Sequence, residues 1–458
     1  MREGLHKIVS LDETIVAVST PLGRSALGTV RISGKQTLTI VERSFRHKTP
    51  LEHRRTILGQ WVDVDGNSLD DVVVTTFHAP HSYTGEDLAE ISAHGNPIIL
   101  QRIVDTVRGY GARLATPGEF TLRAVANGKM DLTQAEAVHD FIEAQTQQQA
   151  RTALQQMEGE ASRRVAPAKR DLVDAIAHLE AGIDFAEDDV DIPNSVVVTG
   201  RLESIKERLH SLTETFGYGR ILTEGVRLTI LGKPNVGKSS LFNRLLAAER
   251  AIVTEIPGTT RDILTETIDF DGIPLRLADT AGVRDTADHV EKIGVRRSLE
   301  AVSDADITLV ILDGSRPLDG DDDHVLSKTK DLPRLVLINK NDLPEVVQLP
   351  ANGVRPIRVS ATTGSGFAEL KQAIQDFLMD RRADLADDFI LTNVRQYEAL
   401  CRATERLSSA TAAVSAGVPH EMVLLDLYAA LEALNEFTGE VVTEDILERI
   451  FATFCIGK

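Results

Sequence analysis

The segment Gly-Lys-Pro-Asn-Val-Gly-Lys-Ser at residues 232–239 constrains this chain more than any other feature. It matches the phosphate-binding loop, whose glycines let backbone N–H groups close around phosphate oxygens. An apolar run at 226–231 precedes it and a helical stretch at 240–246 follows, which is the strand–loop–helix order that the loop requires. The helix N-terminus adds a favourable dipole for phosphate. We therefore expect Lys238 to reach the β and γ phosphates and Ser239 to bind Mg²⁺.

Two further motifs fit a nucleoside triphosphate and its metal. The sequence DTAG at 279–282 ends a predicted strand, so its aspartate can hold Mg²⁺ through water while its glycine senses the γ-phosphate. The sequence GTTRD at 258–262 lies between the loop and the DTAG. Its second threonine, Thr260, stands where a switch threonine that binds Mg²⁺ is expected.

The base is predicted to be guanine. The sequence NKND at 339–342 ends another predicted strand, and Asp342 can accept two hydrogen bonds from the guanine edge, which adenine cannot supply. Ser360 and Ala361 follow the next predicted strand and are expected to lie behind the guanine base and support it. A nucleotide fold that has lost its activity is the alternative, but none of these motifs is degraded.

One departure from the Ras pattern concerns the attacking water. Position 283, directly after the DTAG, holds valine where Ras-like proteins place a glutamine that orients water. Valine has no polar group for this, so another residue must orient the water. The charge on the transferring phosphate must also be neutralised, and Asn235 in the loop is a candidate ligand for a monovalent cation.

The length and composition suit a multidomain cytoplasmic protein. A chain of 458 residues predicts two to four domains, and two cysteines exclude a disulfide framework. The chain has no apolar run of about 18 residues, which predicts no membrane span, and its first residues lack the apolar core of a signal peptide. The net charge of −19 argues against a basic face for tight, nonspecific nucleic-acid binding.

The hydrophobic patterning predicts a multidomain α/β chain in four segments. Residues 1–125 mix short strand-like runs such as 29–32 and 72–77 with turns, typical of an α+β domain. Residues 126–222 and 383–458 have helical periodicity, and Gly217-Tyr218-Gly219 is expected to punctuate the first of these segments. Residues 223–382 alternate helices with strands, which predicts a mostly parallel sheet covered on both faces. The strands are expected at 226–231, 275–278, 307–312, 335–338 and 357–359. The simplest arrangement is one split helical domain with the α/β domain inserted between its parts.

The motifs together resemble the MnmE (TrmE) family of tRNA modification GTPases. The resemblance is carried by the loop with Asn235, by GTTRD at 258–262, and by FCIGK at 454–458. In the first domain it is carried by SYTGED at 82–87, by His94-Gly95 and by PGEF at 117–120. It runs over essentially the whole chain. The FCIGK together with the first-domain motifs is its most specific part, because many families share the nucleotide motifs.

The resemblance implies a tetrahydrofolate-binding N-terminal domain that also forms a homodimer, a split helical domain and an inserted Ras-like G domain. It implies that G domains meet across the dimer in a potassium-dependent way during hydrolysis. Asn235 and Thr259 match the family's side-chain K⁺ ligands, and Thr254 and Ile256 match its backbone ligands. Glu291 matches the glutamate that positions the attacking water through a second water, which Val283 cannot do.

The implied chemistry is modification of the wobble uridine at carbon 5 in certain tRNAs, giving a carboxymethylaminomethyl or aminomethyl group. The resemblance supplies an FAD-dependent partner, MnmG (GidA), which forms a heterotetramer with the dimer. A tetrahydrofolate derivative (5-formyl- or 5,10-methylene-tetrahydrofolate) is the one-carbon donor. Arg31, Glu90, Lys129 and Lys458 match the folate-contacting positions. Cations suit the carboxylate tail of folate, and a carboxylate suits the N–H donors of its pterin.

Without the resemblance, the residues at these positions favour ordinary structural roles over ligand binding or catalysis. Arg31 alternates with apolar residues in a predicted strand, which is typical of a solvated face. Cys455 matches a near-terminal cysteine of the family and is a candidate catalytic residue beside Glu291 and Lys238. By periodicity it shares an apolar face with Ile450 and Phe454, which predicts a buried, inert thiol.

The motifs and the resemblance together predict one set of GTP or GDP contacts. They are Asn235, Val236, Gly237, Lys238, Ser239, Ser240, Thr254, Glu255, Ile256, Pro257, Gly258, Thr259, Thr260, Asp279, Thr280, Ala281, Gly282, Asn339, Lys340, Asp342, Ser360 and Ala361.

Two other function classes remain open at this point. A regulatory or ribosome-assembly GTPase would share the nucleotide motifs, although such proteins more often carry a basic RNA-binding module. A folate-binding sensor or scaffold, whose G domain only controls dimerisation, would bind folate without changing tRNA.

Overall fold

The computed structural model describes residues 12–184, 195–248, 250–252, 265–278, 305–349, 355–379, 389–441 and 443–458. The chain forms two compact units. Unit 1 comprises Met1–His139, Leu154–Leu209 and Glu398–Lys458, and unit 2 comprises Asp140–Ala153 and His210–Tyr397. In the part of the chain that is described, no helix combines the length and the hydropathy needed to cross a bilayer.

Unit 1 contains a sheet of seven strands in the order β3-β4-β5-β6-β2-β1-β7. Its strands are β1 (Ile15–Val18), β2 (Ser25–Ser33), β3 (Phe45–Arg46), β4 (Thr56–Val62), β5 (Ser68–Phe77), β6 (Leu88–Gly95) and β7 (Arg113–Leu114). Neighbours pair antiparallel except β1 and β7, which are parallel. The helices α2 (Thr37–Ser44) and α3 (Pro97–Gly109) pack on this sheet. The predicted α+β fold, with strand runs at 29–32 and 72–77, is confirmed.

The alternation of side chains along β2 places one charged residue on the face opposite the core. Val30 and Ile32 are fully buried in the core beneath α3, together with Ile91 of β6. Because successive residues of a strand point to opposite faces, Arg31 points away from that core. It pairs directly with Glu90 across the β2–β6 ladder.

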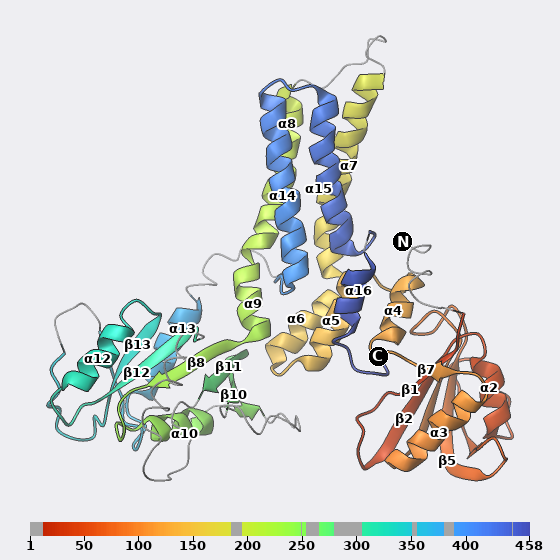
Figure 1. Cartoon of the computed structure of the whole chain (residues 1–458), viewed down its shortest axis with the longest axis horizontal. Helices are drawn as coiled ribbons and strands as arrows, with labels where there is room; N and C mark the ends of the chain where they lie inside the picture. Colours follow the sequence, from red (N-terminus) through yellow and green to blue (C-terminus); the bar gives the residue numbers. More distant parts are fainter. Residues whose placement is uncertain are drawn as a thin grey trace. The chain divides into compact units, whose positions relative to one another are not determined.

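The helices of unit 1 come from both ends of the chain. Besides α2 and α3, the helices wholly or mainly in this unit are α4 (Glu119–Ala126), α5 (Leu132–Glu143), α7 (Glu160–Asp184), α8 (Ser195–Glu214), α14 (Val394–Ser415), α15 (His420–Thr438) and α16 (Glu444–Phe451). The helix α6 (Gln147–Met157) has its residues up to Ala153 in unit 2 and the rest in unit 1. The long helices α7 and α15 pack against each other (Figure 1). Leu132 of α5 and Leu447 of α16 share one buried cluster. The split helical region that the periodicity predicts is therefore present.

Unit 2 contains a second seven-stranded sheet, ordered β14-β13-β12-β8-β11-β10-β9. Its strands are β8 (Val226–Leu231), β9 (Arg250–Ile252), β10 (Thr265–Phe270), β11 (Ile273–Ala278), β12 (Ile307–Asp313), β13 (Arg334–Asn339) and β14 (Ile357–Arg358). The helices beside them are α9 (Phe216–Glu224), α10 (Lys238–Ala248), α12 (Gly320–Lys328) and α13 (Phe367–Met379). All five predicted strands form, and they pair in parallel. The short antiparallel strands β9 and β10 were not predicted.

Helices cover both faces of this sheet, as the continuous apolar runs predict. Leu309 and Ile311 of β12 belong to the cluster that includes α10 and α13. Val310 and Leu312 alternate with them and pack against α12 from the other face. The carboxyl ends of β8, β12, β13 and β14 therefore meet at one edge, which is where ligands bind in such sheets.

The sequence prediction at Gly217-Tyr218-Gly219 is wrong, because these residues lie inside α9 rather than between elements. Glycine is required at position 219 for a reason other than ending a helix. A Cβ atom built on it would come within 1.9 Å of the carbonyl oxygen of Leu391. Glycine is needed there because another segment crosses the helix at its backbone.

Candidate functional site

The phosphate-loop segment connects β8 to α10, which begins at Lys238, two residues earlier than predicted. The Lys238 ammonium donates to the carbonyl oxygens of Gly232 at 2.9 Å and Lys233 at 2.8 Å. Gly237 has a φ of +101°, and a Cβ atom there would lie 2.2 Å from Nδ2 of Asn339. Only glycine allows this loop conformation, which places Lys238 beside the backbone that would surround phosphate.

Asn339 links the loop to two neighbouring strand ends. Its Nδ2 donates to the Val236 carbonyl at 2.7 Å, and its Oδ1 accepts from the Ala361 N–H at 3.0 Å. The side chain is buried, with both ends of its amide satisfied. The predicted phosphate contacts and the predicted base contacts are thus joined by one side chain.

The residues predicted to bind the base lie together after β13 and β14. The Ser360 hydroxyl donates to Oδ1 of Asp342 at 2.5 Å and accepts from the Thr363 N–H at 3.1 Å. These bonds orient the Asp342 carboxylate. Lys340, with a φ of +66°, donates to Oδ2 of Asp313 at 2.6 Å.

The structure adds acidic partners that the sequence analysis missed. Asp313 ends β12, and Ser315 donates to it through both N–H and hydroxyl. Burial disfavours ionised Asp313, but the hydrogen bonds from Lys340 and Ser315 outweigh it and hold the pKa of Asp313 below its usual range. In addition, Lys233 lies 2.6 Å from Asp319 and 2.7 Å from Asp322, at the N-terminus of α12. These partners are distant in sequence from the motifs they support, so no spacing rule reveals them.

The remaining loop positions are open to solvent. Asn235, Ser239 and Ser240 are exposed, and Asn235 has a left-handed backbone with a φ of +65°. Ser239 follows Lys238 directly, so its hydroxyl lies at the end of the loop. This position suits a metal ligand that also contacts phosphate.

Half of the predicted nucleotide contacts, and the predicted catalytic residue Glu291, lie outside the described residues, and their roles stay predictions. These positions are Thr254, Glu255, Ile256, Pro257, Gly258, Thr259, Thr260, Asp279, Thr280, Ala281, Gly282 and Glu291.

A second polar site lies in unit 1, and we call Arg31, Glu90 and Lys458 together the Arg31 site. The Arg31 guanidinium donates to Oε1 of Glu90 from Nε at 3.1 Å and from Nη2 at 2.7 Å. Its Nη1 donates to the carbonyl of Gly457 at 3.3 Å. The side chain of Arg31 is 13% exposed. The solvated face that the residues alone favour for Arg31 is therefore wrong, because the segment around Gly457 covers it.

Lys458 is held in this site by its backbone, and its side chain is half-buried. Its carbonyl accepts from the Phe120 N–H at 3.2 Å. Burial, followed by the nearby Arg31 charge, lowers the pKa of Lys458 below its usual range. Arg31, which pairs with Glu90, and Lys458 therefore place two cations near one carboxylate, and this excess of positive charge favours an added anion.

Two aromatic rings lie against Arg31. Its Cζ is 5.5 Å from the centre of the Tyr83 ring and 5.6 Å from that of Phe120. The Tyr83 hydroxyl and Thr121 share a hydrogen bond of 2.8 Å, and burial raises the Tyr83 pKa. The rings thus connect Arg31 to the loop at 78–87 and to α4.

The other two unit 1 positions are placed differently. Lys129 follows α4 and donates to the Pro80 carbonyl at 3.1 Å, so it contacts the same loop that carries Tyr83. Cys455 is exposed, so the predicted buried thiol is wrong. The physical reason is that α16 ends at Phe451, and helical periodicity does not extend to Cys455.

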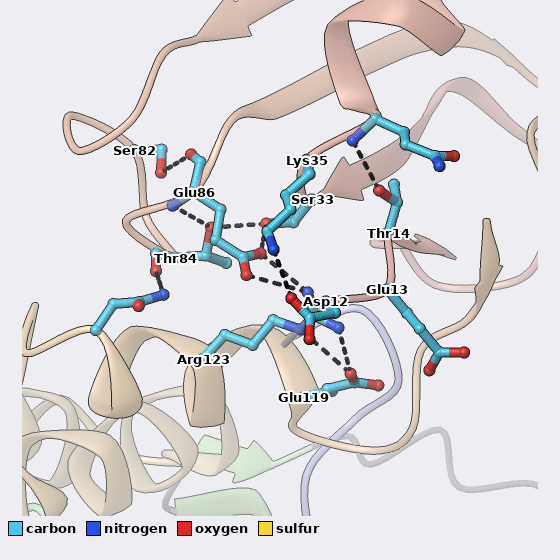
Figure 2. Close-up of polar contacts among 12 residues, drawn as sticks. Asp12, Glu13, Thr14, Ser33, Lys35, Ser82, Thr84, Glu86, Glu119 and Arg123 are labelled. Carbon is cyan, nitrogen blue, oxygen red and sulfur yellow. Dashed lines mark hydrogen bonds and ion pairs between the residues drawn. The ribbon is translucent and has the colours of Figure 1, made fainter. Parts of the chain in front are cut away.

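Arg123, Glu86 and Glu119 form a buried charge network, which we call the Arg123 network (Figure 2). Arg123 of α4 is fully buried between Glu86 and Glu119. Burial disfavours ionised Glu119, but hydrogen bonds from Arg113 and the Thr116 N–H, with Arg123 nearby, hold the pKa of Glu119 below its usual range. Glu86 and Glu119 belong to the SYTGED and PGEF motifs, so the sequence marked both without indicating their partner.

Comparison with known proteins covers both units. Residues 14–129 match the family described as GTP-binding protein TrmE N-terminus, and residues 132–455 match the MnmE helical domain. The chain is 46% identical over 455 residues to the tRNA modification GTPase MnmE of Koribacter versatilis, covering 98% of this chain and 100% of the relative. It is 43% identical over 449 residues to the protein of the same name from Aquifex aeolicus, covering 97% and 100%. The chain therefore belongs to the MnmE family of tRNA modification GTPases.

Proposed function

We propose that this chain hydrolyses GTP to GDP and phosphate, and that this cycle drives modification of carbon 5 of the wobble uridine in certain tRNAs. The observation that carries the proposal is the presence of two built sites in one chain. Asn339 joins the phosphate loop to the base motifs in unit 2. Unit 1 holds Arg31, Glu90 and Lys458 together, as the resemblance requires of a folate site.

In the nucleotide site, each described residue has a chemical task. When GTP binds, the Lys238 ammonium would exchange its hydrogen bonds with the loop carbonyls for bonds with the β and γ phosphates. Asp342, which Ser360 orients, would accept hydrogen bonds from guanine. Ser239 and Thr260 would hold Mg²⁺, which neutralises charge on the phosphates. Asn235, Thr254, Ile256 and Thr259 would hold K⁺ where two G domains meet, and Glu291 would position the water.

In unit 1, we propose that a tetrahydrofolate derivative, 5-formyl- or 5,10-methylene-tetrahydrofolate, binds at the Arg31 site. The donor set fits this ligand, because two cations and one carboxylate lie together, with aromatic rings beside them. Arg31, Glu90, Lys129 and Lys458 would contact the folate, since cations suit its carboxylates and a carboxylate suits the N–H groups of its pterin. When bound, the folate supplies the one-carbon unit. Cys455, exposed in the adjoining segment, would take part in the modification.

The remaining components follow from family membership. Segment 1–125 would form a homodimer and bind folate, 126–222 and 383–458 would form the helical domain, and 223–382 would form the G domain. The FAD-dependent MnmG (GidA) would complete a heterotetramer that acts on tRNA in the cytoplasm and adds a carboxymethylaminomethyl or aminomethyl group. The flavin would reside on that partner.

The test is mass spectrometry of tRNA nucleosides from cells that lack this protein. The deletion is complemented with the wild type, with Lys238→Ala or with Cys455→Ser. The proposal expects the carbon-5 wobble modifications to vanish in the deletion, to return with the wild type and to stay absent with Lys238→Ala. Unchanged nucleosides in the deletion strain would contradict the modification role and favour a ribosome-assembly GTPase. Folate binding with unchanged nucleosides would favour a folate sensor.

A further inference from the structure

Arg123 is a fully buried arginine that reaches between two carboxylates from different segments. Its Nη1 donates to both oxygens of Glu86, at 3.0 and 3.2 Å. Its Nε and Nη2 donate to Oε1 of Glu119 at 3.2 and 2.9 Å. Figure 2 shows the guanidinium joining the loop that carries Glu86 to the start of α4. The arginine fork therefore sets the separation of these two segments.

Each carboxylate belongs to a segment that also carries an aromatic ring of the Arg31 site. Tyr83 lies in the loop three residues before Glu86, and Phe120 directly follows Glu119. Both rings lie within 5.6 Å of the Arg31 guanidinium carbon. Moving the loop away from α4 would separate one ring from the other and change what surrounds Arg31.

The network is also tied to the strand that carries Arg31. The Ser33 hydroxyl of β2 donates to Oε2 of Glu86 at 2.8 Å and shares a 2.7 Å hydrogen bond with Thr84. Ser33 is two residues from Arg31, on the same side of the strand. The loop, α4 and β2 therefore meet at one charged centre.

The burial of the Arg123 network indicates that it positions the segments that carry Glu86 and Glu119 more than it stabilises the fold. A buried ion pair is a weak source of stability, because desolvation cancels much of its attraction and an apolar replacement is often equally stable. What Arg123 adds is direction, since its planar guanidinium donates to Glu86 from Nη1 and to Glu119 from Nε and Nη2. The side chains of Arg123 and Glu119 are 0% and 2% exposed, so solvent does not screen this constraint.

We propose that Arg123 is a positioning residue for the Arg31 site. By bridging Glu86 and Glu119, it fixes Tyr83 and Phe120 beside Arg31 and so sets the affinity of the site for a folate. This inference rests on the proposed folate function. It concerns a residue that lies outside the predicted contact set and acts without touching the ligand.

The experiment measures 5-formyltetrahydrofolate binding by calorimetry to the full-length wild type and to Arg123→Lys, well below the melting temperature of each. Lysine keeps the charge but lacks the fork that reaches both carboxylates. The matched control is Arg102→Lys in α3, which alters the more exposed ion pair with Asp63 in the same unit. GTP hydrolysis and melting temperature are recorded for every variant.

The inference expects at least a tenfold rise in the folate dissociation constant for Arg123→Lys, with GTP hydrolysis unchanged and Arg102→Lys within twofold of the wild type. A second readout separates positioning from general loosening. In a Tyr83→Leu background one positioned ring is already gone. The fold-change that Arg123→Lys causes in the folate dissociation constant is therefore expected to be at least fivefold smaller in that background than in the wild type.

Each other outcome counts against a named claim. A folded Arg123→Lys protein that binds folate as the wild type does, or an effect that is unchanged in the Tyr83→Leu background, overturns the positioning role alone. A wild-type chain that does not bind folate overturns the proposed folate site and this inference with it. If Arg123→Lys does not fold, Glu86→Gln decides the question, because it leaves Glu119 to neutralise Arg123. Glu86→Gln is expected to weaken folate binding about fivefold, and wild-type binding by it overturns the inference.

Discussion

The ammonium of Lys340 lies 2.6 Å from the carboxylate of Asp313, which ends the neighbouring parallel strand. Lys340 belongs to the base-recognition motif, whereas Asp313 belongs to no motif identified in the sequence. The Asp313 side chain is 10% exposed, so this pair is weakly screened by solvent. The position of Lys340 in the predicted base site therefore depends on a residue outside the sequence motifs.

Replacing Asp313 by asparagine is expected to weaken GDP binding. The change removes the charged acceptor of Lys340 while it preserves the side-chain shape, so Lys340 loses its fixed position. We expect the GDP dissociation constant to rise about tenfold, which corresponds to ~1.4 kcal/mol. Fluorescent-GDP titration measures the change. Asp376→Asn on α13 is the control, because it removes a carboxylate from an exposed pair. Equal affinities for Asp313→Asn and the wild type would contradict the argument.

Two glycines of α9 are expected to respond in opposite directions to alanine. At Gly219 the new methyl group would lie 1.9 Å from the Leu391 carbonyl, so Gly219→Ala should lower the free energy of unfolding by about 1–3 kcal/mol. At Gly217 nothing lies within 4 Å, so Gly217→Ala should raise it by about 0.5–1 kcal/mol, because alanine favours helix. Denaturant unfolding of the two variants tests this, and equal effects would show that the Leu391 crossing is not rigid.

Protonation of Glu119 at low pH is expected to lower the free energy of unfolding of unit 1. Its pKa lies below the ordinary value of 4.5 in the folded chain, so its stabilisation is fully present above about pH 4.5 and is lost as pH falls through the folded pKa. Glu119→Gln should cost ~3 kcal/mol at pH 7, and this cost should shrink towards pH 3. Urea unfolding at several pH values measures it.

The control for Glu119 is Glu13→Gln. Glu13 also pairs with Arg113, but its side chain is 53% exposed, so the loss should stay under about 1 kcal/mol. A Glu119→Gln penalty that is constant from pH 7 to pH 3 would show that the Glu119 charge has no part in stability.

Glu291 is expected to be needed for hydrolysis, as the resemblance implies. Glu291→Ala should slow single-turnover GTP hydrolysis by about 100-fold or more, with little change in GTP affinity, since the water loses its positioning group. Glu300→Ala, nine residues further along the chain, serves as the control. Hydrolysis at the wild-type rate by Glu291→Ala would rule out the assigned role.

Asn235 is expected to confer a preference for potassium. The wild type should hydrolyse GTP faster in potassium than in sodium, because an ion of suitable size neutralises charge on the transferring phosphate. Asn235→Ala should remove most of this difference by deleting one ligand. Equal wild-type rates in the two salts would exclude the role given to Asn235.

The elements that local pattern determines were predictable from the sequence. The five parallel strands of unit 2 are largely apolar runs, and the loop at 232–239 needs its own residues in a fixed order, so both could be located. Parallel strands then bring Asn339 and Ser360 to one edge without further information. The contact of Asn339 with the Val236 carbonyl follows from that convergence.

What the sequence did not reveal depends on contacts between distant segments. Arg123 is 37 residues from Glu86, and the charge of each predicts an exposed side chain until the partner is known. The covering of Arg31 by Gly457 spans 426 residues. Cys455 was misplaced because periodicity cannot show where α16 ends.

The packing of α7 against α15 has a consequence for synthesis on the ribosome. The ~235 residues between Asp184 and His420 take roughly 10–50 s to translate at typical rates. During that interval α7 has left the ribosome with its apolar side uncovered, while the nucleotide-site sheet of unit 2 is completed and can fold. The side of α7 that packs on α15 has no such partner during this interval, so synonymous codon changes that slow translation of residues 210–397 should increase aggregation of the newly made chain.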